Sequence, residues 1–155
     1  MWVGDLTYLR TQEGFLYLAL LTDKSSHKIV GYHCGDTLEA MGCIRALEMA
    51  LAGLPKGAKP IHHTDRGSQY CCHAYVERLK KRGLSISMTE TNHTAENAMA
   101  ERMNGILKGE YWLGIEFKNK KEAGRAVDHA VRMYNTRRPH RALGNQFPNV
   151  VHLAE

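Results

Sequence analysis

The sequence predicts a single α/β domain built on a mixed sheet of five strands with helices on both faces. Apolar runs separated by tight polar turns occupy the first 34 residues, which is typical of an antiparallel meander. Helical and strand patterns then alternate, and such alternation requires parallel neighbours in the sheet. The chain has 155 residues, 43% of them hydrophobic, which is enough for one core and too few for two full domains.

The three N-terminal strands are expected at residues 2–9, 15–22 and 29–34. Polar segments at residues 11–14 and 23–26 separate them and supply the turn-forming residue types. Because the connections are short, consecutive strands must run antiparallel to each other.

The remaining chain changes to a β-α rhythm. Apolar residues recur at helical spacing from Thr37 to Leu54, and Gly53 and Pro55 end that pattern. The tail from Asn135 is expected to be irregular. Beyond the first helix, we expect strands at residues 61–64 and 84–88, and helices at 73–81, 95–112 and 120–134. The order βββαβαβα, with three antiparallel and then two parallel strands, is the ribonuclease-H-like arrangement.

Composition narrows the functional classes. The formal net charge is +5, which is compatible with a polyanionic partner without requiring one. No apolar run reaches the roughly 18 residues of a membrane span, and the first residues lack the layout of a signal peptide. The four cysteines show no metal-type or disulfide-type spacing. We therefore expect a cytoplasmic protein with reduced thiols and no membrane partner.

Three acidic residues are candidates for a metal site. Asp5 lies within an apolar strand, where a carboxylate is costly to bury without a cation or a donor. Asp65 directly follows the predicted strand 61–64, and Glu101 lies in a predicted helix after 35 intervening residues. If strands one and four are neighbours, Asp5 and Asp65 face each other and the helix brings Glu101 to them. Such oxygen ligands suit Mg²⁺ or Mn²⁺, and two ions about 4 Å apart can catalyse phosphoryl transfer.

Each acid also has a purely structural interpretation. Asp65 and Gly67 are residue types that favour turns, so their segment could be a turn and nothing more. Glu101 could be an exposed helix residue paired with a neighbouring cation. Asp5 is the hardest to explain in this way, because its flanking residues are apolar.

Four segments in order carry a family resemblance. They are WVGDLTY at 2–8, HTDRGSQY at 63–70, ENAMAERMNGILKGE at 96–110 and YNTRRPHRALG at 134–144. Together they resemble the retroviral-integrase-type catalytic core of bacterial insertion-sequence transposases, over nearly the whole chain. The resemblance implies that Asp5, Asp65 and Glu101 form an Asp-Asp-Glu triad that holds two Mg²⁺ or Mn²⁺ ions.

The resemblance also implies the reaction. The enzyme would cut at the transposon end to free a 3′-hydroxyl, which would then attack a phosphodiester of target DNA. No covalent protein–DNA intermediate is implied. We expect a DNA strand-transfer enzyme that acts on transposon ends and target DNA in the bacterial cytoplasm, as a homo-oligomer when active.

Two further residues of the catalytic helix are expected to contact DNA. Lys108 follows Glu101 by two helical turns and therefore lies on the same face. Asn104 lies three residues after Glu101, where its amide could orient the carboxylate or contact DNA. Solvation of the lysine and surface exposure of the amide are the alternatives.

Basic residues elsewhere extend the predicted DNA path. Residues 101–155 carry a net charge of +4, against +1 for residues 1–100. Arg138 and Arg141 belong to this basic segment and could line a phosphate path. Arg66, beside Asp65, could contact DNA or only hold its loop closed.

We interpret residues 1–155 as one catalytic core domain. Nothing before Trp2 corresponds to the helix-turn-helix region with which such transposases recognise their terminal repeats, so we expect an isolated core. Two alternatives remain open: a ribonuclease-H-like nuclease that only hydrolyses nucleic acid, and a catalytically silent DNA-binding remnant of a truncated element.

Overall fold

The computed structural model describes residues 1–65, 67–88 and 98–154. The first three strands are β1 (Trp2–Thr11), β2 (Gly14–Asp23) and β3 (Ile29–Gly35). Both β1–β2 and β2–β3 pair antiparallel, which confirms the predicted meander. Each strand extends a residue or more beyond the predicted bounds, because the backbone pairing continues into the turns.

Two short parallel strands complete the predicted sheet. β4 (His62–Thr64) pairs with β1, placing Trp2 opposite His62 and Val3 opposite His63. β5 (Ile86–Met88) pairs with β4, so the sheet order is β3-β2-β1-β4-β5. The predicted neighbourhood of strands one and four is therefore confirmed.

A sixth strand was not predicted. β6 (Glu116–Phe117) pairs in parallel with the far end of β1, where Arg10 faces Glu116. Two residues are too few to show an alternating pattern, so only the tertiary structure reveals this strand.

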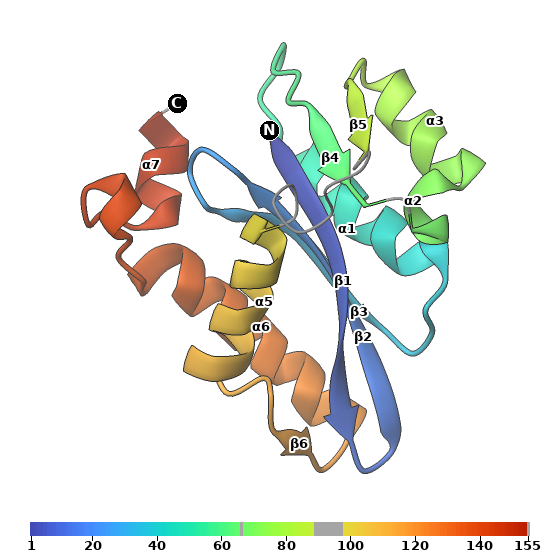
Figure 1. Cartoon of the computed structure of the whole chain (residues 1–155), viewed down its shortest axis with the longest axis vertical. Coiled ribbons are helices and arrows are strands. Elements are labelled where there is room, and N and C mark those ends of the chain that lie inside the picture. Colours follow the sequence, from blue (N-terminus) through green and yellow to red (C-terminus); the bar gives the residue numbers. More distant parts are fainter. Residues whose placement is uncertain (66, 89–97, 155) are drawn as a thin grey trace.

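Helices cover both faces of the sheet (Figure 1). On one face lie α1 (Ala40–Ala52), the single turn α2 (Ser68–Cys71) and α3 (His73–Lys81), which pack with Trp2, Ala19 and Leu21. On the other face lie α5 (Ala98–Glu110) and α6 (Lys120–Arg137), which pack with Leu9, Leu18 and Leu20. These two apolar clusters are the cores of the domain.

Helix α5 ends at Glu110, two residues before the predicted end at residue 112, because the backbone leaves the helical conformation there. Trp112 has a φ of 62°, and the amides of Leu113 and Gly114 donate to the carbonyls of Leu107 and Lys108. A residue in the left-handed region thus follows the helix, and two backbone hydrogen bonds that each span six residues close its end. The predicted start of this helix, residues 95–97, lies outside the described residues.

The expectation of an irregular tail was wrong. Helix α6 continues to Arg137, because the Asn135 side chain accepts from the Ile29 amide at 2.9 Å and donates to the Ile29 carbonyl at 3.0 Å. A 3₁₀ turn (Arg141–Leu143) and helix α7 (Pro148–Ala154) follow. None of the described helices is both long and apolar enough to cross a membrane.

Candidate active site

The site lies where β1 and β4 run side by side. At Gly4 a Cβ would lie only 2.7 Å from Cγ2 of Thr64 and 3.1 Å from Cδ2 of Leu21, so a larger residue would separate these strands. Because side chains alternate along a strand, Asp5 points to the opposite face, which α5 covers. Continuing the register of Val3 and His63 by two residues places Asp5 opposite Asp65.

Asp5 is half-buried and electrostatically crowded. Burial raises the pKa of its carboxyl most, and the negative charges of Asp65 and Glu101 raise that pKa further. Hydrogen bonds from the Leu6 backbone and from the Asn104 amide act in the opposite direction. The three predicted acids therefore share one electrostatic neighbourhood, although they are distant in sequence.

Asp65 is held by its own turn. Its Oδ1 accepts a hydrogen bond from the Gly67 amide at 2.9 Å. A Cβ at Gly67 would lie 2.9 Å from that same oxygen, so the tight turn favours glycine at this position. The turn interpretation of Asp65 is correct as a description of the loop, and the charge of Asp65 also acts on Asp5.

Glu101 is exposed in the first turn of α5. The neighbouring Ala100 and Met103 are buried and hold this helix against the domain. A long side chain on a fixed helix can change rotamer without disturbing the core. Glu101 is thus close enough to influence Asp5 but is not anchored to it.

The residues fit a divalent cation by chemistry and charge. Within the described residues, no three Asp, Glu, His or Cys side chains are already close enough together to enclose an ion. The donors are nevertheless hard carboxylate oxygens, and their mutual repulsion at Asp5 is what a divalent cation would relieve. The buried Oδ1 of Asn104 also has no hydrogen-bond partner among the described residues.

The other predicted residues of α5 have defined contacts. The Asn104 amide donates to Oδ2 of Asp5, so it orients that carboxylate and not Glu101. The Nζ of Lys108 lies 4.9 Å from the ring centroid of Tyr8, three residues along β1 from Asp5. This is a cation–π distance. Sequence patterns gave no signal for either contact, because both join segments about 100 residues apart.

Arg138 and Arg141, the two predicted DNA-binding residues near the C-terminus, differ in their contacts. Arg138 forms a two-pronged ion pair with Glu110, at 2.7 Å from each carboxylate oxygen, and its side chain is only 18% exposed. Arg141 is exposed in the 3₁₀ turn. Arg66 lies outside the described residues, so its predicted DNA contact has no structural description here.

Family models and curated relatives match almost the whole chain. Two models, each described as an integrase core domain, match residues 1–94 and 82–148. The chain is 40% identical to the transposase for insertion sequence element IS629 of Shigella sonnei, over 96% of this chain and 50% of that protein. It is 36% identical to the transposase InsF for insertion sequence IS3A of Escherichia coli, over 95% and 51%. The chain thus spans about half the length of these relatives.

Solved structures match the fold. The HTLV-2 integrase catalytic core domain in complex with magnesium superposes with a TM-score of 0.76 at 19% identity, covering 97% of this chain and 94% of that one. The catalytic core domain of BIV integrase gives a TM-score of 0.73 at 15% identity, covering 99% and 93%. The mixed sheet with helices on both faces is therefore ribonuclease-H-like, as predicted. With a family model matching more than half of its residues, the chain belongs to the integrase core domain family.

Proposed function

We propose that this chain is the catalytic core of a bacterial insertion-sequence transposase, which cleaves DNA at a 3′ end and joins that end to target DNA. The observation that carries the proposal is geometric: β4, which Asp65 follows, pairs with β1, which carries Asp5, and Asn104 of the helix that carries Glu101 donates a hydrogen bond to Asp5. The names of the relatives and the four motifs of the sequence support the same reaction.

Asp5, Asp65 and Glu101 would hold two Mg²⁺ or Mn²⁺ ions. Such ions supply charge neutralisation at the reacting phosphodiester and lower the pKa of an attacking water or hydroxyl. The described residues provide the surroundings of that site. Asn104 holds the Asp5 carboxylate in one orientation, and its hydrogen bond favours the ionised form that a cation needs.

Basic residues around the site would bind the DNA backbone. Lys108 projects from the same helix as Glu101 and is steadied over the ring of Tyr8, so its ammonium is positioned to contact a phosphate. Arg141 and Arg66 would add contacts of the same kind. Because Arg138 is ion-paired with Glu110, we propose that its main role is to position the segment that carries Arg141. DNA at transposon ends and in the target would be the partner, bound by a homo-oligomer.

A nuclease that hydrolyses DNA and stops would use the same three acids. A branched duplex that mimics the joined product distinguishes the two reactions, because strand transfer is reversible and needs no end recognition on such a substrate. With Mn²⁺ present, a transposase core reseals the target strand: its 3′-hydroxyl attacks the phosphodiester at the branch point, and the transposon strand leaves with a free 3′-hydroxyl. If the branched DNA is hydrolysed and no resealed strand is formed, the chain is a nuclease, which would contradict our proposal.

Matched carboxylate variants complete this experiment. Asp65→Asn should abolish resealing, whereas Asp36→Asn, a change at an exposed carboxylate paired with Lys120, should leave it intact. Equal resealing by the two variants would contradict the assignment of Asp65. Absence of any reaction by the wild-type chain would favour the silent DNA-binding remnant.

A further inference from the structure

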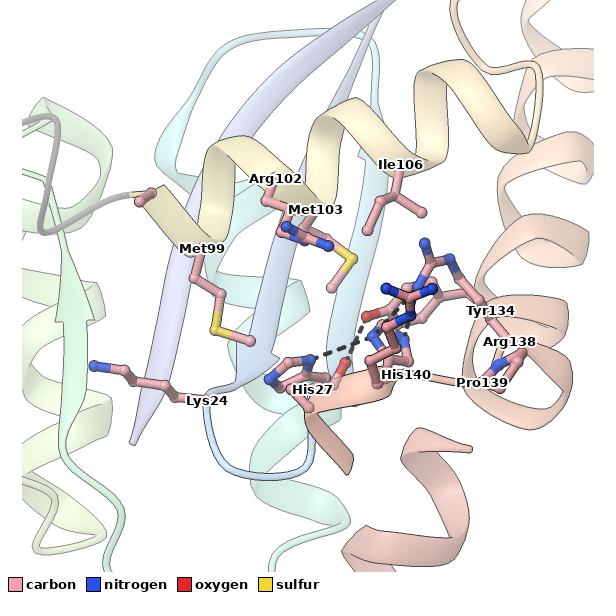
Figure 2. A pocket seen from close by; sticks show the side chains of 13 residues that line it. Lys24, His27, Met99, Arg102, Met103, Ile106, Tyr134, Arg138, Pro139 and His140 are labelled. Atoms are coloured by element: carbon pink, nitrogen blue, oxygen red, sulfur yellow. Dashed lines mark hydrogen bonds between the residues drawn. The ribbon is translucent and has the colours of Figure 1, made fainter. Parts of the chain in front are cut away.

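A cavity lies beside α5, on the side of this helix away from Glu101 and Asn104. It has a volume of about 750 Å³ and lies between α5, the β2–β3 turn and the segment after α6 (Figure 2). Met99, Arg102, Met103 and Ile106 line it, whereas Glu101 and Asn104 do not. One helix therefore separates the candidate active site from this cavity.

The cavity is strongly cationic. Lys24, Arg102, Arg138 and Arg141 all line it, and among the described residues no Asp or Glu does. Only Arg138 forms an ion pair, with Glu110, whereas Lys24, Arg102 and Arg141 pair with no carboxylate in the described part of the chain. Figure 2 shows Arg102 on α5 and Arg138 at the end of α6, with His27 and His140 side by side and joined by a dashed line. Three cations that form no ion pair with a described carboxylate favour an anion as the ligand of this cavity.

Two histidines whose pKa values are lowered by burial, and then by nearby cations, line the cavity. Nδ1 of His27 lies 3.4 Å from Nδ1 of His140, and the two rings meet edge to face at 5.1 Å. Burial and, after it, Arg138, His27 and Arg102 together lower the pKa of His140 to about 4. Burial and then Arg102 also lower the pKa of His27, while Asp23 partly opposes them. Both rings can therefore offer neutral hydrogen-bonding groups to a ligand.

The remaining wall is apolar and aromatic. Met99, Met103, Ile106 and Tyr134 contribute it, and Tyr134 packs edge to face on His140 at 5.3 Å. A bare phosphate needs cations but no such surface, and it fills only a fraction of this volume. A phosphate with an attached planar base would use both the cations and the apolar wall.

We propose that this cavity binds a nucleotide of a DNA strand. Its phosphate would lie among Lys24, Arg102 and Arg141, and its base would lie against the apolar wall that Met99, Met103, Ile106 and Tyr134 form. The inference rests on DNA being the substrate in the proposed function, but not on metal-dependent catalysis. Because Glu101 and Arg102 are adjacent on α5, a strand crossing the start of this helix reaches both sites. The cavity would thus hold one DNA strand beside the reacting phosphodiester.

The test measures binding without chemistry. Fluorescence anisotropy of a labelled single-stranded oligonucleotide is followed in EDTA for the wild type, Arg102→Gln, Arg141→Gln and the matched control Arg125→Gln. Arg125 is an exposed arginine of α6 that does not line the cavity. We expect roughly tenfold weaker binding for each cavity variant, with a salt dependence reduced by about one phosphate contact, and little change for the control. Losses no larger than that of Arg125→Gln would overturn the inference.

Two further measurements identify the ligand. Deoxythymidine monophosphate should displace the oligonucleotide at concentrations where inorganic phosphate does not, because only the nucleotide uses the apolar wall. Equal competition by phosphate, or preference for a phosphoserine peptide, would overturn the proposal.

The variant Asp65→Asn separates DNA binding from catalysis. We expect it to bind the oligonucleotide with wild-type affinity while it catalyses no strand transfer. Wild-type chain that binds DNA through the cavity but catalyses nothing would contradict only the proposed function.

Discussion

The side-chain amide of Asn104 donates a hydrogen bond to Oδ2 of Asp5 and thereby joins α5 to the central strand of the sheet. The contact spans 99 positions of sequence. It fixes the orientation of a half-buried carboxylate whose pKa is raised by burial and by two neighbouring acids. Asn104 is therefore best understood as a positioning residue for Asp5.

Replacing Asn104 by alanine should shift the pH dependence of strand transfer. The amide lowers the pKa of the Asp5 carboxyl, so its loss leaves the effects of burial and of Asp65 less opposed. The acid limb of the pH–rate profile should move to higher pH, and the rate near pH 6.5 should fall about tenfold. The profile is measured on the branched DNA. A uniform loss of rate at every pH would show that Asn104 acts otherwise.

Replacing Gly4 by alanine should destabilise the domain. The added Cβ would lie 2.7 Å from Cγ2 of Thr64, so β1 or β4 must shift, at a cost of about 1–3 kcal/mol. Gly124 within α6 is the matched control, since no described atom apart from the helix's own backbone lies within 4 Å of a Cβ built there, and alanine should add about 0.5–1 kcal/mol of stability. Urea unfolding of both variants checks the signs. A neutral Gly4→Ala would disprove the close approach of these strands.

Acid should destabilise the fold through His62. This fully buried ring hydrogen-bonds the Tyr75 hydroxyl at 2.6 Å, and burial lowers its pKa from 6.5 to about 4. Between those values the unfolded chain binds a proton that the folded chain does not. The free energy of unfolding is therefore unaffected by His62 above about pH 6.5. It decreases as the pH drops towards 4, by at most about 3 kcal/mol from this residue.

The comparison of wild type with His62→Gln isolates that effect. His140, whose pKa is also lowered to about 4, contributes to the acid slope in both proteins. The free energy of unfolding of His62→Gln should change less between pH 7 and pH 4.5 than that of the wild type. The same slope in both would contradict the buried neutral histidine.

Replacing Lys108 by glutamine should weaken DNA binding without unfolding the domain. Its ammonium lies over the half-exposed ring of Tyr8 and forms no ion pair in the described part of the chain. We expect a several-fold loss of affinity and a salt slope smaller by about one contact, with an unchanged melting temperature. Lys108→Arg should restore most of the affinity. An affinity equal to wild type would identify Lys108 as a solvated surface lysine.

The sequence predicted the features that local patterns encode. The five main strands and α3, α5 and α6 appear near their expected positions, because apolar spacing and glycine stops define them. The pairing of β1 with β4 followed from the predicted ribonuclease-H-like sheet order, and it sets the strand that carries Asp5 beside the strand that Asp65 follows. What remained outside prediction depends on tertiary contacts: β6 is two residues long, and α6 extends because Asn135 binds the backbone of Ile29.

The site residues show the same division. Their residue types and spacing indicated the acids, but no local pattern could show that Asn104 contacts Asp5 or that Arg138 is bound by Glu110. The cationic cavity was also invisible in sequence, because Lys24 and Arg102 lie far from Arg141 along the chain. Only folding brings such residues together.

The most direct test of the account is the position of Mn²⁺ in crystals of this chain, found from its anomalous scattering. We predict an ion about 2.1 Å from carboxylate oxygens of both Asp5 and Asp65, with Glu101 turned towards it. Mn²⁺ bound at other carboxylates of the same crystal, with none at Asp5 and Asp65, would contradict the proposed metal site and the reaction that depends on it.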